Sequence, residues 1–217
     1  MNSRERVLTA IKHQTPDRVP LDCQYCFQPE IWSELKKYRC SEEAILRKFG
    51  IDFRNVGMRN TKEQEMLKEF PKMLPDGTFE DIYGIRRRWS TTLSGMSRHW
   101  VIVSHPLENV DSLDEYKFPE IPDPSARDIA DTARRIRKVQ KDGYAAKFRY
   151  FEHFFELPWQ LRGFNKFIVD LYTNEKFVNE LLDKQLERWL QRAKVLDELR
   201  PDIIWHGDDV GTQVGMM

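Results

Sequence analysis

A run of polar residues near the end of the sequence combines the residue types that carry acid–base and metal chemistry. Residues 203–205, Ile-Ile-Trp, predict a short buried strand, and His206, Asp208 and Asp209 follow it directly. Neighbouring carboxylates repel each other's charge, so one of them can be held protonated as an acid, or both can bind a cation. A histidine beside them can serve as a base or a metal ligand. We therefore name His206, Asp208 and Asp209 as candidate catalytic residues.

The same segment can also be explained without chemistry. Residues 207–211, Gly-Asp-Asp-Val-Gly, are typical of a polar turn whose aspartates accept backbone N–H groups, and His206 can be a hydrogen-bonded core residue. The functional interpretation is favoured because α/β enzymes place their chemistry directly after buried strands. On that interpretation Thr212 and Gln213, which continue the turn, are candidate substrate-binding residues.

A second polar segment follows the strand that we predict at residues 144–148. Parallel strands of one sheet end at the same edge, so Tyr150, Glu152 and His153 are expected to face the same site as the terminal motif. Tyr150 and Glu152 are therefore candidate substrate-binding residues. The aromatic residues around them can be core at helical spacing or the wall of a flat hydrophobic pocket, and the spacing favours core.

The cysteines offer little metal chemistry. Cys23 and Cys26 have the C-x-x-C spacing of redox sites and half-zinc sites, but no second pair and no histidines at zinc-finger spacing accompany them. Buried thiols are the favoured interpretation of both. Three cysteines, an odd number, predict no disulfide framework and fit a reducing compartment, so we expect a cytoplasmic protein.

Composition excludes several classes of partner. Lys plus Arg and Asp plus Glu both number 35, so no net field attracts nucleic acid or an anionic membrane surface. The sequence contains neither a long uncharged apolar run nor a secretory signal pattern. We therefore expect a small-molecule substrate and neither a nucleic-acid nor a membrane partner.

Hydrophobic spacing along the chain predicts an α/β protein. Helices are expected at residues 3–13, 29–37, 41–49, 125–141, 151–161 and 165–172, and from Asn174 onwards. Strands are expected at 51–56, 144–148 and 203–205, an antiparallel ribbon at 74–104, and a surface connection at 106–124. Strand, helices and strand in succession predict a parallel pair with a right-handed crossover. We interpret residues 1–217 as a single incomplete domain in three stretches, 1–73, 74–124 and 125–217.

Eight short pieces of the sequence, in order along the whole chain, resemble the uroporphyrinogen decarboxylase superfamily. They are residues 4–11, 16–20, 81–85, 105–107, 116–119, 161–164, 169–172 and 207–213. The resemblance implies a (β/α)8 barrel of the TIM type, with its active site at the carboxyl ends of the strands. Such a barrel needs about 250 residues. We therefore expect this chain to be roughly its first half, with an N-terminal helical extension and a small antiparallel excursion, completed by a missing C-terminal half or a second chain.

The superfamily contains porphyrinogen decarboxylases and also zinc-dependent methyltransferases that move methyl groups between corrinoid proteins and thiols or other acceptors. The decarboxylases carry an Arg-Gln-Ala-Gly-Arg motif soon after the first strand, whereas residues 22–29 here contain no arginine. Their active-site tyrosine falls near Trp159, and their terminal motif reads close to Phe-Asp-Ser-Trp-Ala-Gly where this chain has residues 206–211, His-Gly-Asp-Asp-Val-Gly. We therefore predict a methyltransferase-like enzyme.

On this resemblance, zinc and a corrinoid (methylcobalamin) on a partner protein are the expected cofactors of the complete enzyme. The family's zinc ligands, a His-x-Cys pair and a later cysteine, fall beyond residue 217. We therefore assign no metal ligand within this segment, where only Cys23 and Cys26 are spaced as ligands. Two alternatives stay open. One is uroporphyrinogen decarboxylation in porphyrin biosynthesis, and the other is a non-catalytic half-barrel that binds a corrinoid protein or pairs with a second chain.

Overall fold

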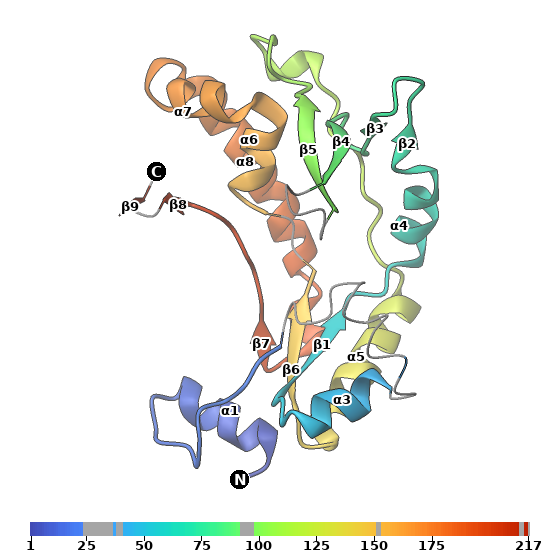
Figure 1. Cartoon of the computed structure of the whole chain (residues 1–217), viewed down its shortest axis with the longest axis vertical. Helices are drawn as coiled ribbons and strands as arrows, with labels where there is room; N and C mark the ends of the chain where they lie inside the picture. The colour runs from blue at the N-terminus through green and yellow to red at the C-terminus, as the bar shows by residue number, and fades with distance from the viewer. Residues whose placement is uncertain (24–36, 38–40, 92–97, 151–152, 213–214, 217) are drawn as a thin grey trace. The chain divides into compact units, whose positions relative to one another are not determined.

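The computed structural model describes residues 1–23, 37, 41–91, 98–150, 153–212 and 215–216, and its chain forms two compact units (Figure 1). Unit 1 comprises Met1–Arg59, Ala126–Tyr150 and Val195–Trp205. Unit 2 comprises Asn60–Ser125, Phe151–Lys194 and His206–Met217. Each unit is therefore assembled from three separate stretches of chain.

Unit 1 contains a parallel sheet and several helices. Its strands are β1 (Phe53–Gly57), β6 (Ala145–Arg149) and β7 (Ile203–Ile204), in the order β1-β6-β7. Its helices are α1 (Ser3–Ile11), α3 (Glu42–Lys48), α5 (Ala126–Lys141) and α9 (Leu196–Leu199). Both strand pairs are parallel, with Phe53 opposite Ala145 and Lys147 opposite Ile203. The predicted α/β class and the parallel pair are therefore confirmed.

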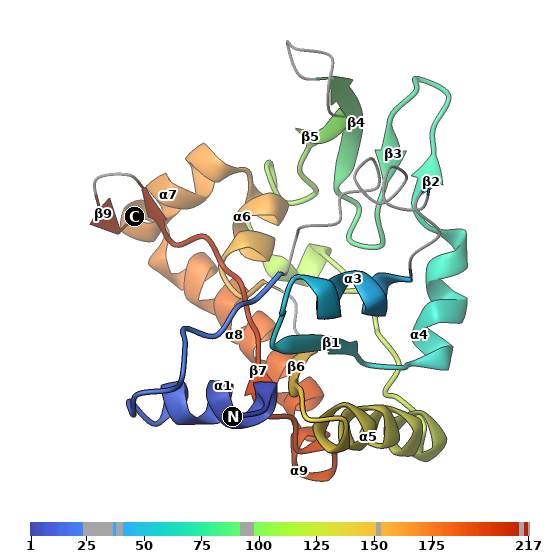
Figure 2. The same ribbon diagram turned by 60° about the horizontal axis from the view of Figure 1, so that its bottom comes forward.

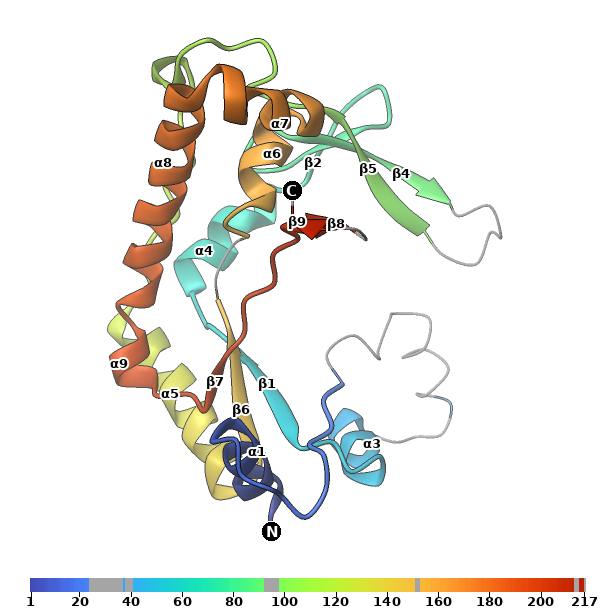
Figure 3. The same ribbon diagram turned by 90° about the vertical axis from the view of Figure 1, so that its left-hand side faces the viewer.

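The core of unit 1 lies between this sheet and helices α5 and α9. Val56, Ala146 and Phe148 point to one face, as the alternation of a strand requires, and pack against apolar residues of the two helices. Figures 2 and 3 show α5 and α9 on the same face of the sheet. The edge strand β7 is less buried than its sequence predicts, because Ile204 is 47% exposed.

A single buried carboxylate joins the N-terminal segment of unit 1 to the sheet. Asp52, immediately before β1, is fully buried and accepts hydrogen bonds from Arg6 (2.6 Å), Arg18 (2.7 Å) and the backbone N–H of Leu21 (2.8 Å). Burial by itself would raise the pKa of Asp52, but the hydrogen bonds from Leu21 and Arg18, followed by those from Ser3 and Arg6, hold this pKa below its ordinary value. Asp52 is therefore ionised and anchors residues 6, 18 and 21 at one point.

A second carboxylate joins α1 to the other strands of unit 1. The guanidinium of Arg4 donates to Asp202 at 2.9 Å, and the backbone N–H of Ala146 donates to the same carboxylate, also at 2.9 Å. The backbone N–H of Arg4 donates to the carbonyl of Gly143 at 2.7 Å. Helix α1 itself begins after Asn2, whose side chain caps it. The described residues 17–23 contain no strand.

Unit 2 combines an antiparallel ribbon with a layer of helices. The ribbon is formed by β2 (Lys72–Met73), β3 (Phe79–Glu80), β4 (Arg86–Thr91) and β5 (Arg98–Ser104), paired in that order, which confirms the predicted excursion. The main helices are α6 (Glu156–Arg162), α7 (Phe164–Thr173) and α8 (Glu175–Ala193). The smaller elements are α4 (Thr61–Met66), η1 (Leu67–Glu69), η2 (Leu113–Glu115), β8 (Gly211–Thr212) and β9 (Gly215–Met216).

The core of unit 2 packs α6, α7 and α8 against the end of the ribbon and the segment that follows it. Leu161, Phe167 and Leu181 from the three helices contact Ile85 and Leu107 in one apolar cluster. Leu107 is fully buried, so the connection predicted to run over the surface begins inside the core. Helix α6 starts at Glu156, later than predicted, and residues 151–152 of the predicted helix lie outside the described part.

Arg162, at the end of α6, is the largest fully buried side chain among the described residues. Its Nε donates to Asp170 at 2.7 Å, and its Nη1 donates to the carbonyls of Leu107 and Val110, both at 2.5 Å. The guanidinium carbon lies 4.1 Å from the ring centroid of Phe177. Arg162 thereby links α6, α7, α8 and the segment after β5. The next residue, Gly163, has a φ of +87°, and a Cβ there would lie 3.4 Å from the ring of His105.

Removing the charge of Asp52 should destabilise unit 1. We expect Asp52→Asn to cost about 3 kcal/mol at pH 7, because it leaves buried Arg6 with one fewer partner. The lowered pKa means that ionised Asp52 stabilises the fold above its unfolded pKa of about 3.9, and this contribution disappears as the pH falls through the folded pKa. The difference in the free energy of unfolding between the wild type and Asp52→Asn, measured by urea unfolding, should therefore become smaller below about pH 4. Glu65→Gln, which removes one charge of an exposed ion pair, serves as the control. An equal difference in unfolding free energy between wild type and Asp52→Asn at pH 7 and pH 3 would contradict the stabilising role of ionised Asp52.

Replacing Arg162 alone should lower the stability of the protein more than replacing Arg162 and Asp170 together. We expect Arg162→Met to destabilise the protein by about 4 kcal/mol, since it leaves the buried Asp170 carboxylate without this partner. Arg162→Met/Asp170→Leu should recover at least about 1 kcal/mol of that loss. Chemical unfolding of both variants measures this, with the exposed Arg134→Met as the matched control. A double variant less stable than the single variant would show that the pair is not the source of the cost.

Candidate functional site

Four polar side chains of unit 2 come together from two segments that are distant in the sequence. His153 and Glu156 lie before and at the start of α6, and His206 and Asp208 lie in the terminal motif. All four are half-buried. The two segments meet through hydrogen bonds between residues 52 to 54 positions apart. The structure therefore gathers His206 and Asp208, two of the predicted catalytic residues, with the His153–Glu156 pair.

Asp208 holds the first turn of α6. The helix has no side-chain cap from its own N-cap residue, Phe155. Instead the backbone N–H of Phe155 donates to Asp208 Oδ2 at 2.5 Å, and that of Glu156 donates to Oδ1 at 2.9 Å. These are the orphan donors that every helix leaves at its start, and a carboxylate there also interacts favourably with the helix dipole. Asp208 is therefore fixed in position, and the turn interpretation of the terminal motif is correct in part.

The imidazole of His153 is oriented by the same terminal motif. Its Nδ1 lies 2.5 Å from the carbonyl oxygen of Gly207 and 2.9 Å from Glu156 Oε2. Both neighbours are acceptors, which assigns the proton to Nδ1 and leaves a lone pair on Nε2. The backbone carbonyl of His153 accepts a hydrogen bond from the buried Gln185 of α8 at 3.0 Å. The residue is thereby held on both its main chain and its side chain.

His206 completes the cluster and packs on an aromatic residue. Its Nε2 lies 3.6 Å from Asp208 Oδ2, and its ring meets Trp189 edge to face at a centroid distance of 5.5 Å. The ring centroids of His206 and His153 are 6.4 Å apart. The Nδ1 atom of His206 is buried without a hydrogen-bond partner among the described residues.

Three of these residues could also hold a metal ion. His153, Glu156 and Asp208 each offer one ligand atom, and the three atoms all lie within 4.8 Å of one another. One imidazole nitrogen and two carboxylate oxygens form a donor set that suits divalent first-row metals. The sequence interpretation missed this group because Glu156 was placed inside a predicted apolar helix. A histidine and a glutamate three positions apart at a helix start was the available signal.

The other predicted site residues fall elsewhere. Asp209 is exposed, in contrast to its neighbour Asp208. Tyr150 belongs to unit 1, where its ring packs against Phe148 at 6.1 Å. Glu152 and Gln213 lie outside the described residues, and Thr212 is described only through its backbone in β8.

Of the two cysteines at ligand spacing, Cys23 is disulfide-bonded. It therefore offers no thiolate to a metal, and a buried free thiol was not the correct interpretation for it. Cys26 lies outside the described residues.

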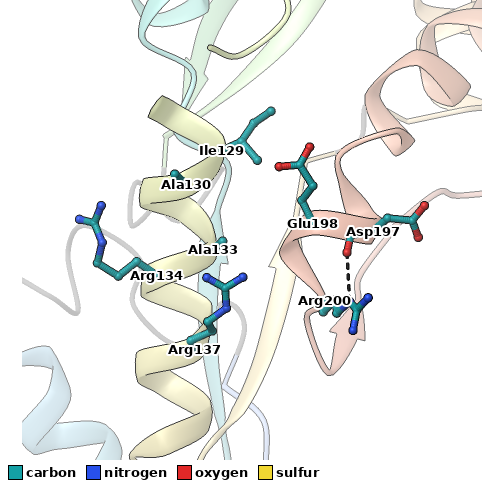
Figure 4. Close-up of a pocket in the computed structure, with 8 residues that line it drawn as sticks. All are labelled: Ile129, Ala130, Ala133, Arg134, Arg137, Asp197, Glu198 and Arg200. Atoms are coloured by element: carbon teal, nitrogen blue, oxygen red, sulfur yellow. Dashed lines mark hydrogen bonds between the residues drawn. The ribbon is translucent and has the colours of Figure 1, made fainter. Parts of the chain in front are cut away.

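A separate surface pocket lies in unit 1. A pocket of about 650 Å³ lies between α5 and α9, lined by Ile129, Ala130, Ala133, Arg134, Arg137, Asp197, Glu198 and Arg200 (Figure 4). Within it Arg200 Nε donates to the carbonyl of Asp197 at 3.1 Å. Its charged side chains are of mixed sign and come from the helices that cover the sheet. We therefore assign no chemistry to this pocket.

Comparison with known proteins relates this chain to a methyltransferase by fold. The structure is similar to that of a methyltransferase from Methanosarcina mazei, with a TM-score of 0.56, 15% sequence identity and coverage of 100% of this chain. The chain spans 61% of the length of that protein. At this identity the likeness shows the fold alone. No protein-family model matches the sequence, and no curated protein matches it.

Within the described residues, the helices include none with the length and apolar character needed to cross a bilayer. The expectation of no membrane partner otherwise stays a prediction.

Asp208 should matter more for stability than Asp209. We expect Asp208→Asn to cost about 1 kcal/mol, because the amide keeps one oxygen for the start of α6 and loses the other. Asp209→Asn, at an exposed position beside it, should change the free energy of unfolding by less than about 0.5 kcal/mol. Chemical unfolding of the two variants measures the difference. Equal costs would show that Asp208 does not cap the helix.

Proposed function

We propose that this chain belongs to a methyl-transfer enzyme whose reacting groups include His206 and Asp208. The observation that carries the proposal is the assembly of His153, Glu156, His206 and Asp208 at the start of α6. The fold likeness to a methyltransferase supports the reaction class. The motifs that resemble the uroporphyrinogen decarboxylase superfamily support the finer proposal that the methyl group passes between a corrinoid protein and a thiol or similar acceptor.

The proposed reaction assigns distinct tasks to the residues of the cluster. A thiol acceptor must lose its S–H proton before its sulfur attacks the methyl carbon; the C–S bond then forms, and the electron pair of the broken bond stays with the donor. His206 Nε2 would take the proton, and Asp208 at 3.6 Å would stabilise the resulting imidazolium. Asp208 can do this without reorganising, because two backbone N–H groups already hold it.

The zinc that the resemblance implies does not fit the described residues as a thiolate site. Its expected ligands include two cysteines, whereas the described cysteine, Cys23, is disulfide-bonded. When bound, zinc would supply Lewis acidity toward the acceptor thiol. The zinc ligands that the resemblance implies remain a proposal for residues beyond those of this sequence. The corrinoid partner is likewise a proposal.

The proposal predicts which substitutions stop turnover. Free methylcobalamin serves as the methyl donor and a panel of small thiols as acceptors, with loss of the donor followed by absorbance. His206→Gln and Asp208→Asn should each lower the rate by about a hundredfold or more, the usual contribution of an acid–base group. His99→Gln, at an exposed histidine of β5, is the matched control.

Several outcomes would reject the proposal. Formation of coproporphyrinogen from uroporphyrinogen would favour the decarboxylase alternative. Tight binding of a corrinoid protein without demethylation would favour the non-catalytic half-barrel. Turnover that is equal in wild type and both site variants would remove His206 and Asp208 from the reaction.

A further inference from the structure

We propose that His153, Glu156 and Asp208 form a binding site for one divalent metal ion, with Zn²⁺ as the best-fitting species. The three ligand atoms lie within 4.8 Å of one another and come from two segments that fold onto each other. This inference is independent of the proposed methyl transfer, because it concerns binding alone. It also differs from the zinc site implied by the family resemblance, since no cysteine takes part.

The donor set selects the class of ion. Imidazole nitrogen favours zinc and its neighbours among the first-row metals, and two carboxylates add oxygen ligands that zinc also accepts. Two ligands of one tetrahedral zinc lie about 3.3 Å apart, given bond lengths of about 2.0–2.2 Å. The ligand atoms of His153, Glu156 and Asp208 all lie within 4.8 Å of one another, which is close to this spacing. Three protein ligands would leave the fourth position open, as in catalytic zinc sites.

The ligands are held in place by neighbouring groups. Asp208 accepts one backbone N–H on each carboxylate oxygen, and each oxygen keeps a further lone pair for a cation. His153 is oriented by the carbonyl of Gly207 at 2.5 Å. Metal-binding histidines commonly donate their other ring N–H to such a carbonyl, which fixes the ring and its tautomer. The supporting contacts of a metal site are therefore present.

Charge gives a separate reason for a cation at this point. Glu156 and Asp208 bring two carboxylates within 4.8 Å of each other, an arrangement that is unfavourable unless positive charge lies nearby. The adjacent groups are the imidazoles of His153, 2.9 Å from Glu156, and His206, 3.6 Å from Asp208. An imidazole supplies positive charge only when protonated, whereas a divalent ion supplies it at any pH at which the ligands are deprotonated.

Metal binding to the whole chain tests the proposal directly. After chelator treatment and dialysis, titration calorimetry with ZnCl₂ should show one ion per chain, and bound zinc should raise the thermal midpoint. His153→Gln and Glu156→Gln should each weaken binding by about a hundredfold. His99→Gln and Glu69→Gln, which change exposed residues of the same types, should bind as the wild type does. Circular dichroism verifies that each variant is folded.

Cobalt substitution identifies the ligands independently of affinity. Co²⁺ bound here should give visible absorption bands without the thiolate-to-cobalt charge-transfer band that cysteine ligands produce. The proposal is overturned if the folded wild-type chain binds no stoichiometric zinc, or if the His153→Gln/Glu156→Gln double variant retains it. The proposal is also overturned if the Cys23→Ser variant loses zinc binding while the Glu156→Gln variant keeps it. Each result leaves the assignment of His206 and Asp208 to methyl transfer to be decided by turnover.

Discussion

The complete burial of the Arg162 guanidinium is the constraint on which the arrangement of unit 2 depends. A buried arginine is tolerated only when its N–H groups are paired, and here the partners come from α7 and from the segment after β5. Since Arg162 is the last residue of α6, these contacts fix one end of that helix. Asp208 fixes the other end through two backbone N–H groups. A seven-residue helix held at both ends is what positions His153 and Glu156 for the site.

Most of the motifs that resemble the uroporphyrinogen decarboxylase superfamily build the scaffold. In unit 1, Arg4, Arg6 and Arg18 belong to them and converge on the carboxylates of Asp202 and Asp52. In unit 2, three motifs meet at one place, because Arg162 binds Asp170 and the carbonyl of Leu107. These motifs therefore specify a fold.

The motif at residues 81–85 has a similar structural role. Asp81 accepts the N–H groups of Tyr83 and Ile85, at 2.9 and 3.0 Å, and also pairs with Arg87. Of the resembling pieces, the terminal one, residues 207–213, contributes Asp208 to the candidate site. A resemblance concentrated in scaffold residues supports the architecture more strongly than the reaction, which agrees with a structural neighbour found at 15% identity.

Local patterns in the sequence determined the elements of secondary structure and the class of the fold. Apolar spacing placed α5, α7, α8, β1 and β6 near their observed bounds, Ser41 caps α3, and Gly143 adopts the left-handed conformation expected at a helix end. The tertiary structure alone decided that Arg162 and Arg87 are buried, that Asp208 caps a helix 52 residues away, and that Glu156 joins the site while Tyr150 packs in unit 1. The physical reason is the distance along the chain over which each kind of interaction acts. Helix and strand preferences act over a few neighbouring residues, whereas the burial of a charge and the meeting of ligands depend on which distant segments the folded chain brings into contact.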